Sequence, residues 1–235
     1  MAGAFRGGLL GPMQRRRMQA SIRRIIEKSS LRLGICDTMC AAYAERYGAP
    51  FRSFQNTIDV QAALAKSRDM TQLGNPLKVV YSGSVFAYAQ LYSLIDCCQA
   101  VAALAGQGLN VVMHIYCPPS HIASVRERLE ISPSIYIHGP LTDDADFFST
   151  LSEADALLIP ANFDEETISF IRYSMPTRVP AYLASGTPIL VYGPPEVAQV
   201  QYAKQEKWGY VVDKKGIGFL TSALKNILSV QKLLR

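Results

Sequence analysis

The stretch YSMPTRVPAYLASGTPIL, residues 173–190, decides how this chain folds. A loop enters a short helix through Pro176, because proline suits the first turn of a helix, and Gly186 is a residue type that ends one. We expect the helix over Arg178–Ser185 and a buried strand over Pro188–Val191 directly after it. A helix that leads straight into a short apolar strand is the repeating half of an α/β fold.

The same alternation of short apolar runs and helical patterns extends outward over residues 77–235. The predicted strands are Lys78–Tyr81, Asn110–Tyr116, Ile135–His138, Ala156–Ile159, Pro188–Val191 and Gly209–Val212. The predicted helices are Ala89–Ala105, Ala123–Leu129, Asp144–Ser152, Arg178–Ser185, Pro195–Lys204 and Gly218–Leu234. Because parallel strands need helical crossovers, this rhythm predicts an α/β, Rossmann-like fold with a doubly wound parallel sheet.

The chain before this region is expected to be a partial strand–helix unit. A basic amphipathic helix over residues 13–28 is followed by a strand, Leu31–Cys36, and a helix, Thr38–Tyr47. The next residues lack apolar periodicity and end in a Gly-Asn-Pro turn, which is typical of a linker. Three units are therefore expected, namely a partial N-terminal domain, a linker and a main domain, at residues 1–59, 60–76 and 77–235.

The net charge of +5 is concentrated at the start of the chain. Residues 1–30 carry seven basic side chains against one glutamate, whereas the remainder carries 17 basic and 18 acidic groups. The main domain therefore offers no basic field to nucleic acid. The helix over residues 13–28 has two interpretations. Its apolar side either packs on a sheet, which we favour, or lies on an anionic membrane surface.

The cysteines and histidines show no catalytic or metal-binding spacing. The five cysteines lack paired C-x-x-C patterns, so we expect buried reduced thiols in a cytoplasmic protein. The three histidines have no serine or cysteine partner pattern and no zinc spacing, so neither a metal nor another cofactor is expected. No apolar run reaches the roughly 18 residues that cross a bilayer. Peripheral contact with the inner membrane surface, through residues 13–28, is the membrane role left open.

Ligands of a doubly wound sheet bind beyond the carboxyl ends of its strands, so the residues there are the candidates. Gly83 and Ser84 follow the first strand of the main domain, where the next helix N-terminus would supply N–H groups and a positive dipole to a phosphate. Ser174, Thr177 and Arg178 bring hydroxyls, amides and a permanent cation to the start of a later helix. A diphosphate suits this chemistry. The alternative is structural: the glycine only turns the chain, the serine caps a helix and the arginine is solvated.

These residues carry a resemblance. Residues 173–195 resemble the signature of retaining GT-B glycosyltransferases, in which a Pro-Ser-Lys-Leu-x-Glu-Tyr-Leu-Ala-x-Gly-x-Pro-Ile-Leu pattern is usual. The stretches VYSGS (80–84), IHGPL (137–141) and ADALLIP (154–160) are similar to the same domain and follow in the same order. The segment Leu31–Asp59 resembles the last strand, helix and exit loop of that family's first domain, whose earlier part has no counterpart in the sequence.

The resemblance implies that the main domain holds a nucleotide-diphosphate sugar, without a metal, for retaining transfer to an acceptor on the other lobe. Gly83, Ser84 and Arg178 would lie at the diphosphate. The ribose and base would lie near His138, Gly139, Ala181, Tyr182, Leu183 and Ala184. One departure stands out, because the family's ribose-binding glutamate and its acidic partner are replaced by Ala181 and Tyr173.

Two functions remain open from the sequence, and a third, another GT-B enzyme such as a nucleotide-sugar epimerase, fits the signature of residues 173–190 less well. The first is a glycosyltransferase donor-binding lobe for a UDP- or GDP-sugar, completed by an acceptor lobe that a separate chain or another copy supplies. The second is an inactive GT-B remnant that acts as a binding or assembly module, which Ala181 favours. Activity, as a hexosyltransferase, is therefore left open. The acidic run Asp164–Glu166 is expected as a solvated loop that also offers a carboxylate to a sugar hydroxyl.

Overall fold

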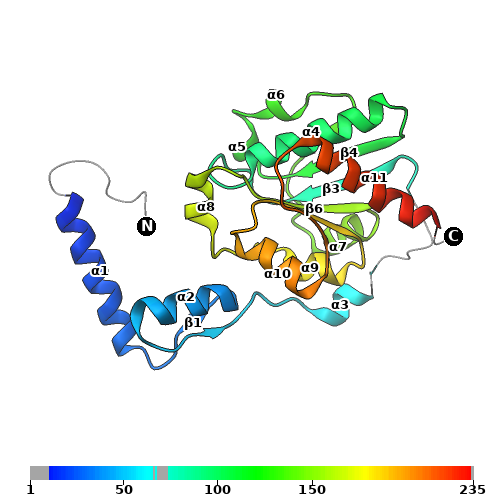
Figure 1. The fold of residues 1–235 in the computed structure, drawn as a ribbon. Helices are drawn as coiled ribbons and strands as arrows, with labels where there is room; N and C mark the ends of the chain where they lie inside the picture. The colour runs from blue at the N-terminus through cyan, green and yellow to red at the C-terminus, as the bar shows by residue number, and fades with distance from the viewer. Residues whose placement is uncertain (1–10, 66, 68–73, 234–235) are drawn as a thin grey trace.

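The body of the protein is a six-stranded parallel sheet with helices on both faces (Figure 1). The computed structural model describes residues 11–65, 67 and 74–233. The strands lie in the order β5-β4-β3-β6-β7-β8, and every neighbouring pair is parallel. Their bounds are β3 Leu77–Ser82, β4 Val111–Tyr116, β5 Ile135–His138, β6 Ala156–Pro160, β7 Ile189–Tyr192 and β8 Tyr210–Val212. The predicted α/β fold with a doubly wound sheet is confirmed.

The order of the strands reverses in the middle of the sheet. The chain begins at β3, builds outward to β5, returns beside β3 with β6 and then builds outward to β8. In register, Val80 lies beside His114 on one neighbour, and Val79 lies beside Ala156 on the other. The loops that leave β3 and β6 therefore run to opposite sides, and the crevice between them is where ligands of such sheets bind.

Alternate strand residues enter two separate apolar cores. Val79 and Leu158 pack with α4 and α11, whereas Val80 and Leu157 pack with α7, α9 and α10. The helices of the body are α4 Leu91–Gly106, α5 Pro119–Ile122, α6 Arg126–Leu129, α7 Asp144–Ser152, α8 Glu165–Ile171, α9 Val179–Ala184, α10 Ala198–Glu206 and α11 Ile217–Leu233. Strands buried on both faces are continuous apolar runs, which is why the sequence predicts each of them to within one residue at either end.

Helix α8 corrects the expectation of a solvated loop at Asp164–Glu166. Asp164 is the N-cap of this helix, and its carboxylate accepts hydrogen bonds from the backbone N–H and the hydroxyl of Thr167, at 2.8 and 2.7 Å. Burial raises the pKa of Asp164, but these hydrogen bonds outweigh it and hold the pKa below its usual value. The carboxylate is thus occupied by capping and is not presented to a sugar hydroxyl.

The N-terminal residues form a separate small unit. It contains α1 Gly11–Lys28, β1 Leu33–Gly34, α2 Asp37–Tyr47 and β2 Arg52–Ser53, and the chain then passes through α3 Val60–Leu64 toward the body. Strands β1 and β2 pair in parallel and form a two-stranded sheet. Helix α2 contacts the body through the rings of Tyr43 and Tyr173, whose centroids lie 6.3 Å apart. The predicted strand–helix unit is present, and the helix α3 was not predicted.

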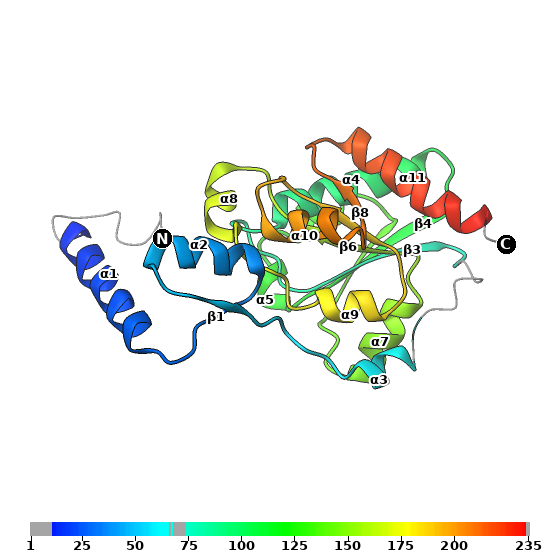
Figure 2. The same ribbon diagram turned by 60° about the horizontal axis from the view of Figure 1, so that its bottom comes forward.

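Helix α1 stands apart from the body in both views (Figures 1 and 2). Ile25, on the apolar side of the helix, is 65% exposed. Met18, Ile22 and Ile26, on the same side, are only partly buried. The favoured interpretation, in which this side packs on a sheet, therefore does not hold within the described part of the chain. An apolar helix face that is exposed to solvent is a candidate for contact with another protein or with a membrane surface.

The cysteines are free and buried at all five positions, as the sequence predicts. Cys36 joins the two units, because its thiol donates a hydrogen bond to the carbonyl of Tyr173 at 3.6 Å. Within the described residues, none of the helices has both the length and the apolarity needed to cross a bilayer.

Asp155 connects the start of β6 to the start of β3 and to the residues just before it. Its side chain is buried, and its carboxylate accepts hydrogen bonds from the backbone N–H groups of Gly74 and Lys78, at 3.2 and 2.7 Å. Replacing Asp155→Ala leaves these donors unsatisfied and should lower the free energy of unfolding by about 2–3 kcal/mol in urea denaturation. Asp155→Asn keeps an acceptor and should lose clearly less. Equal losses for the two variants would show that the hydrogen bonds do not matter.

Candidate functional site

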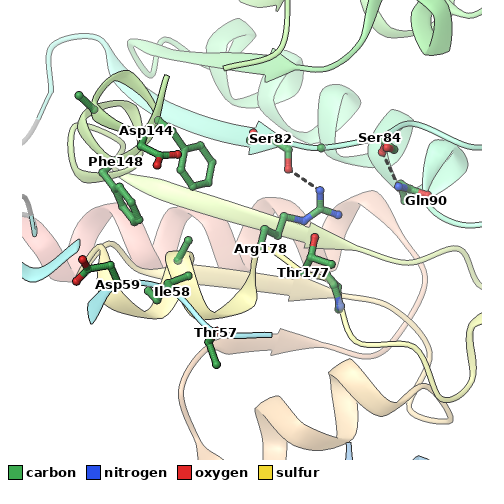
Figure 3. A pocket seen from close by; sticks show the side chains of 15 residues that line it. Thr57, Ile58, Asp59, Ser82, Ser84, Gln90, Asp144, Phe148, Thr177 and Arg178 are labelled. Atoms are coloured by element: carbon green, nitrogen blue, oxygen red, sulfur yellow. Dashed lines mark hydrogen bonds between the residues drawn. The ribbon is translucent and has the colours of Figure 1, made fainter. Parts of the chain in front are cut away.

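A cavity of about 910 Å³ lies at the carboxyl end of β3, beside the point where the strand order reverses (Figure 3). Its volume is within the range of sites for small molecules. The loop after β3 forms one wall, and the residues at the start of α9 form another. The lining residues are Thr57, Ile58, Asp59, Ser82, Gly83, Ser84, Gln90, Asp144, Ala145, Phe147, Phe148, Pro176, Thr177, Arg178 and Ala181. We call this cavity the donor pocket, after the donor-binding role that the resemblance implies for Gly83, Ser84 and Arg178.

The loop after β3 is held in place by two buried tyrosines. The hydroxyl of Tyr81 and the side-chain amide of Gln90 both donate hydrogen bonds to the carbonyl of Ser84. From the other side, the hydroxyl of Tyr182 accepts a hydrogen bond from the backbone N–H of Ser82 at 3.0 Å. The loop is therefore fixed before any ligand arrives, which lowers the entropic cost of binding.

The guanidinium of Arg178 lies directly against Gly83 in this loop. Its guanidinium donates a hydrogen bond to the carbonyl of Ser82, and its central carbon lies 4.6 Å from the centre of the Tyr81 ring. A Cβ atom at Gly83 would lie 1.6 Å from Nη1 of the arginine, and the glycine has a φ of +147°. Only glycine combines this backbone conformation with such a close approach.

The charge of Arg178 is not neutralised by the described residues, none of whose carboxylates forms an ion pair with it. Burial raises the pKa of Tyr182 to about 12, so this neighbour is a neutral phenol and supplies no counter-charge. The Nε atom of Arg178 is buried and has no hydrogen-bond partner within the described part of the chain. A guanidinium in this state on the wall of a cavity favours an anionic ligand.

One prediction about this loop is wrong. The N-terminus of α4 was expected to offer its N–H groups to a phosphate beside Gly83, but α4 begins only at Leu91. The backbone N–H groups of Tyr92 and Ser93 donate instead to the side-chain oxygen of Asn162, at 2.9 and 3.1 Å. Asn162 therefore caps this helix from 70 residues away, and the anion-binding role falls to the loop and the arginine.

The structure brings together some of the predicted site residues and separates others. Gly83, Ser84, Thr177, Arg178 and Ala181 all line the donor pocket. Four other predictions do not lie on its wall. Tyr182 is buried beneath the pocket, Leu183 lines a cavity with Trp208, and Ser174 lines a cavity beside α2, whereas Ala184 is only partly buried.

The predicted base-binding residues, His138 and Gly139, also lie away from the lining, at the end of β5. The ring of His138 stacks on that of Tyr116, with centroids 4.7 Å apart. Its Nε2 atom lies 2.8 Å from Nδ1 of His114, so one imidazole donates to the other. Burial lowers the pKa of His138, and burial, His138 and Lys78 lower that of His114. Both rings are therefore neutral at pH 7.

Sequence reasoning missed the apolar wall of the donor pocket. Phe147 and Phe148 come from α7, and their ring centroids lie 5.4 Å apart at a steep angle. Ile58 reaches the same pocket from the chain that leaves the N-terminal unit. The two phenylalanines lie on a predicted helix, but nothing in the periodicity distinguished a pocket wall from a core face. Ala181, which is 4% exposed, continues this wall.

The fold is that of GT-B glycosyltransferases, as comparison with solved structures shows. WaaG, a glycosyltransferase involved in lipopolysaccharide biosynthesis, matches with a TM-score of 0.63 and 15% identity over 95% of this chain and 61% of its own. A trehalose 6-phosphate synthase from Burkholderia multivorans matches with a TM-score of 0.66 and 14% identity over 91% of this chain and 55% of its own. The pneumococcal O-GlcNAc transferase GtfA, in complex with UDP and GlcNAc, matches with a TM-score of 0.54 and 12% identity over 89% and 40%.

The chain thus spans between 40% and 61% of the length of these three structures. No protein-family model matches the sequence. A search of curated proteins also found no match. At identities of 15% and below, the similarity establishes the fold. The ligands bound by these neighbours do not by themselves identify a ligand of this chain.

The close approach at Gly83 predicts a coupled pair of substitutions. Gly83→Ala adds a Cβ where Nη1 of Arg178 lies and imposes a backbone conformation that alanine avoids. We expect it to lower the free energy of unfolding by about 1–3 kcal/mol, and to cost less in a chain that also carries Arg178→Ala. Gly106→Ala, where the new Cβ meets open space, is the matched control and should not destabilise. Strict additivity of the pair would contradict the clash.

The histidine pair predicts a stability that declines in mild acid. The folded-state pKa values lie below the unfolded value of about 6.5, so the unfolded chain binds more protons as the pH falls through 6.5. The free energy of unfolding should therefore fall from pH 7.5 toward the folded-state pKa values. Thermal unfolding followed by circular dichroism measures this slope. The double variant with His114→Phe and His138→Phe should be flatter over the same range, and an unchanged slope would assign the effect elsewhere.

Proposed function

We propose that this chain is the donor-binding lobe of a glycosyltransferase and that the donor pocket holds the diphosphate of a nucleotide sugar. The observation that carries the proposal is the unpaired guanidinium of Arg178 above the fixed Gly83 loop. An anion that enters the pocket meets a permanent cation and the loop residues Ser82 and Ser84. The likeness of the fold to glycosyltransferases, one of them in complex with UDP and GlcNAc, supports the same reading.

In this proposal, the residues act mainly on the leaving group. When the sugar–phosphate bond of the donor breaks, negative charge grows on the released diphosphate. Arg178, already aligned by its hydrogen bond to Ser82 and its contact with Tyr81, stabilises that charge without reorganising. No metal takes part in the proposed step, and the sugar is transferred with retention, as the resemblance implies.

The wall formed by Ala181, Phe147 and Phe148 bears on how the nucleoside is held. Ala181 offers no carboxylate to ribose hydroxyls, and the aromatic rings offer flat apolar surface. Donor affinity should therefore depend on the diphosphate and on contact with a base more than on ribose hydrogen bonds. The same observation keeps a second function in view, a GT-B remnant that binds ligand without turnover and serves as a binding or assembly module.

The N-terminal unit supports a further part of the proposal, that an acceptor lobe completes the protein. Strands β1 and β2 form a two-stranded parallel sheet, and such a sheet is marginal by itself because parallel strands are normally covered on both faces. Leu31 and Leu33 are 57% and 51% exposed beside it. Further strands, from another polypeptide or another copy of this chain, would cover these residues and the apolar side of α1.

An alternative remains for α1, namely peripheral binding to an anionic inner membrane surface in the cytoplasm. The helix carries five arginines and a lysine against one glutamate, and most of these cations lie off its apolar side. Sedimentation of the protein with vesicles that contain 30% phosphatidylserine, compared with neutral vesicles, distinguishes membrane binding from protein contact. The donor pocket lies on other elements, so either outcome leaves the donor proposal intact.

Titration calorimetry with UDP and GDP tests the donor site. The wild-type chain should bind at least one of them, and Arg178→Gln should weaken binding by about one to two decades, as expected for a lost charge-assisted hydrogen bond. Ala181→Glu should tighten it by a similar factor by restoring a ribose contact. Arg128→Gln, which alters a surface arginine over Tyr92, is the control. Absence of binding to every nucleoside diphosphate at millimolar concentration would refute the donor site.

A further inference from the structure

A second cavity, of about 490 Å³, lies between the N-terminal unit and the body. Helix α2 forms one side, and the segment from α8 to the residue before Met175 forms the other. The lining residues are Met39, Tyr43, Arg46, Tyr47, Ser169, Phe170, Arg172, Tyr173 and Ser174. None of them lines the donor pocket, although the two cavities use neighbouring parts of the sequence. Ser174 lines this cavity, and Pro176 lines the donor pocket. We call this second cavity the inter-unit cavity.

The inter-unit cavity is lined by cations and hydroxyl groups and by no acidic side chain. Arg46 and Arg172 approach it from α2 and from the end of α8, and neither pairs with a carboxylate among the described residues. Three tyrosines and two serines supply hydroxyls that both donate and accept hydrogen bonds. This combination favours a ligand that carries a negative charge together with several hydroxyls.

The aromatic side of the cavity is fixed before a ligand binds. The ring centroid of Tyr43 lies 5.9 Å from that of Tyr47, 5.6 Å from that of Phe51 and 6.3 Å from that of Tyr173, all in edge-to-face contact. Such contacts hold the rings in one arrangement. Because Tyr43 contacts rings from both units, these edge-to-face contacts make this wall of the cavity rigid.

Phe170 adds an exposed flat surface to the same cavity. Its side chain is 66% exposed, and its ring is held by an edge-to-face contact with Tyr88, with centroids 5.0 Å apart. A large apolar ring held in place and left open to solvent is a common feature of binding sites. The C–H face of a pyranose ring matches such a surface, while its hydroxyls reach the tyrosines and serines and its charge reaches the arginines.

We infer that the inter-unit cavity binds a sugar that carries a phosphate or carboxylate group. The anionic group lies between Arg46 and Arg172, and the pyranose ring lies on Phe170. Binding of this sugar does not require the donor site. Its role as the acceptor of sugar transfer rests on the proposed function, because the glycosyl group would come from a nucleotide sugar in the donor pocket.

Calorimetric titration of the wild-type chain with glucose 6-phosphate, glucuronate, glucose and inorganic phosphate tests the site. Glucose 6-phosphate or glucuronate should bind at least tenfold more tightly than glucose or inorganic phosphate, since only they use both the cations and the aromatic ring. The stronger of the two identifies the anionic group as phosphate or carboxylate. Absence of binding by both, or equal binding of inorganic phosphate, would overturn the inference.

Variants separate the two halves of the site. Arg46→Gln and Arg172→Gln should each weaken binding of the anionic sugar by about tenfold or more. Phe170→Ala should weaken binding of the anionic sugar without changing the affinity for inorganic phosphate. Arg128→Gln is the matched control, because Arg128 lies 5.5 Å from the ring of Tyr92, as Arg46 does from the ring of Tyr47. Wild-type affinity in the two arginine variants would overturn the assignment. Circular dichroism of each variant shows that the fold is kept.

A parallel titration with UDP distinguishes this inference from the donor proposal. Arg46→Gln should leave UDP binding unchanged, and Arg178→Gln should leave binding of the anionic sugar unchanged, because the two residues line different cavities. Binding of the anionic sugar without any binding of a nucleoside diphosphate would support the inter-unit site and refute the donor site. Loss of anionic-sugar binding in Arg178→Gln would show that the sugar occupies the donor pocket and would overturn the inference.

Discussion

The contact between Arg178 and the loop at Gly83 is the constraint on which the donor pocket depends. The guanidinium needs a neighbour without a Cβ, a carbonyl to accept its hydrogen bond and an aromatic ring beneath it, and Gly83, Ser82 and Tyr81 supply these. All three lie at the end of β3, whereas the arginine precedes α9, so the contact joins the two halves of the sheet across the reversal of strand order. The contact therefore fixes the place of the guanidinium on the wall of the cavity.

The strands could be predicted from the sequence because a parallel sheet buried on both faces is made of apolar runs. The residues that shape the site were harder to find. Asn162 caps α4 through N–H groups of Tyr92 and Ser93, and no local pattern links residues that far apart. Ser174 was expected near the diphosphate because it lies at the start of the same predicted helix as Thr177 and Arg178, but Ser174 and Arg178 line different cavities.

The start of α8 shows the limit of reasoning from composition. An acidic run after a strand is usually a solvated loop, yet the first of these residues, Asp164, captures the backbone and hydroxyl of Thr167 and begins a helix. That helix carries Phe170 to the inter-unit cavity and Ile171 to the core. The cap at Asp164 therefore helps to position both the exposed Phe170 and the buried Ile171. A prediction that treats the acidic run as a loop places neither side chain.

The two departures from the glycosyltransferase signature have a common physical consequence. Ala181 is buried in the wall of the donor pocket, and Tyr173 packs its ring on Tyr43 while its carbonyl accepts a hydrogen bond from Cys36. Where the resembling family has carboxylates, this chain thus has side chains that pack, one of them holding the N-terminal unit to the body. With no carboxylate at positions 173 and 181, Arg178 has no ion-pair partner among the described residues. In the proposed function, recognition of an anion in the donor pocket then depends on the arginine and the Gly83 loop, and Tyr173, at the position of the acidic partner, helps to form the wall of the inter-unit cavity.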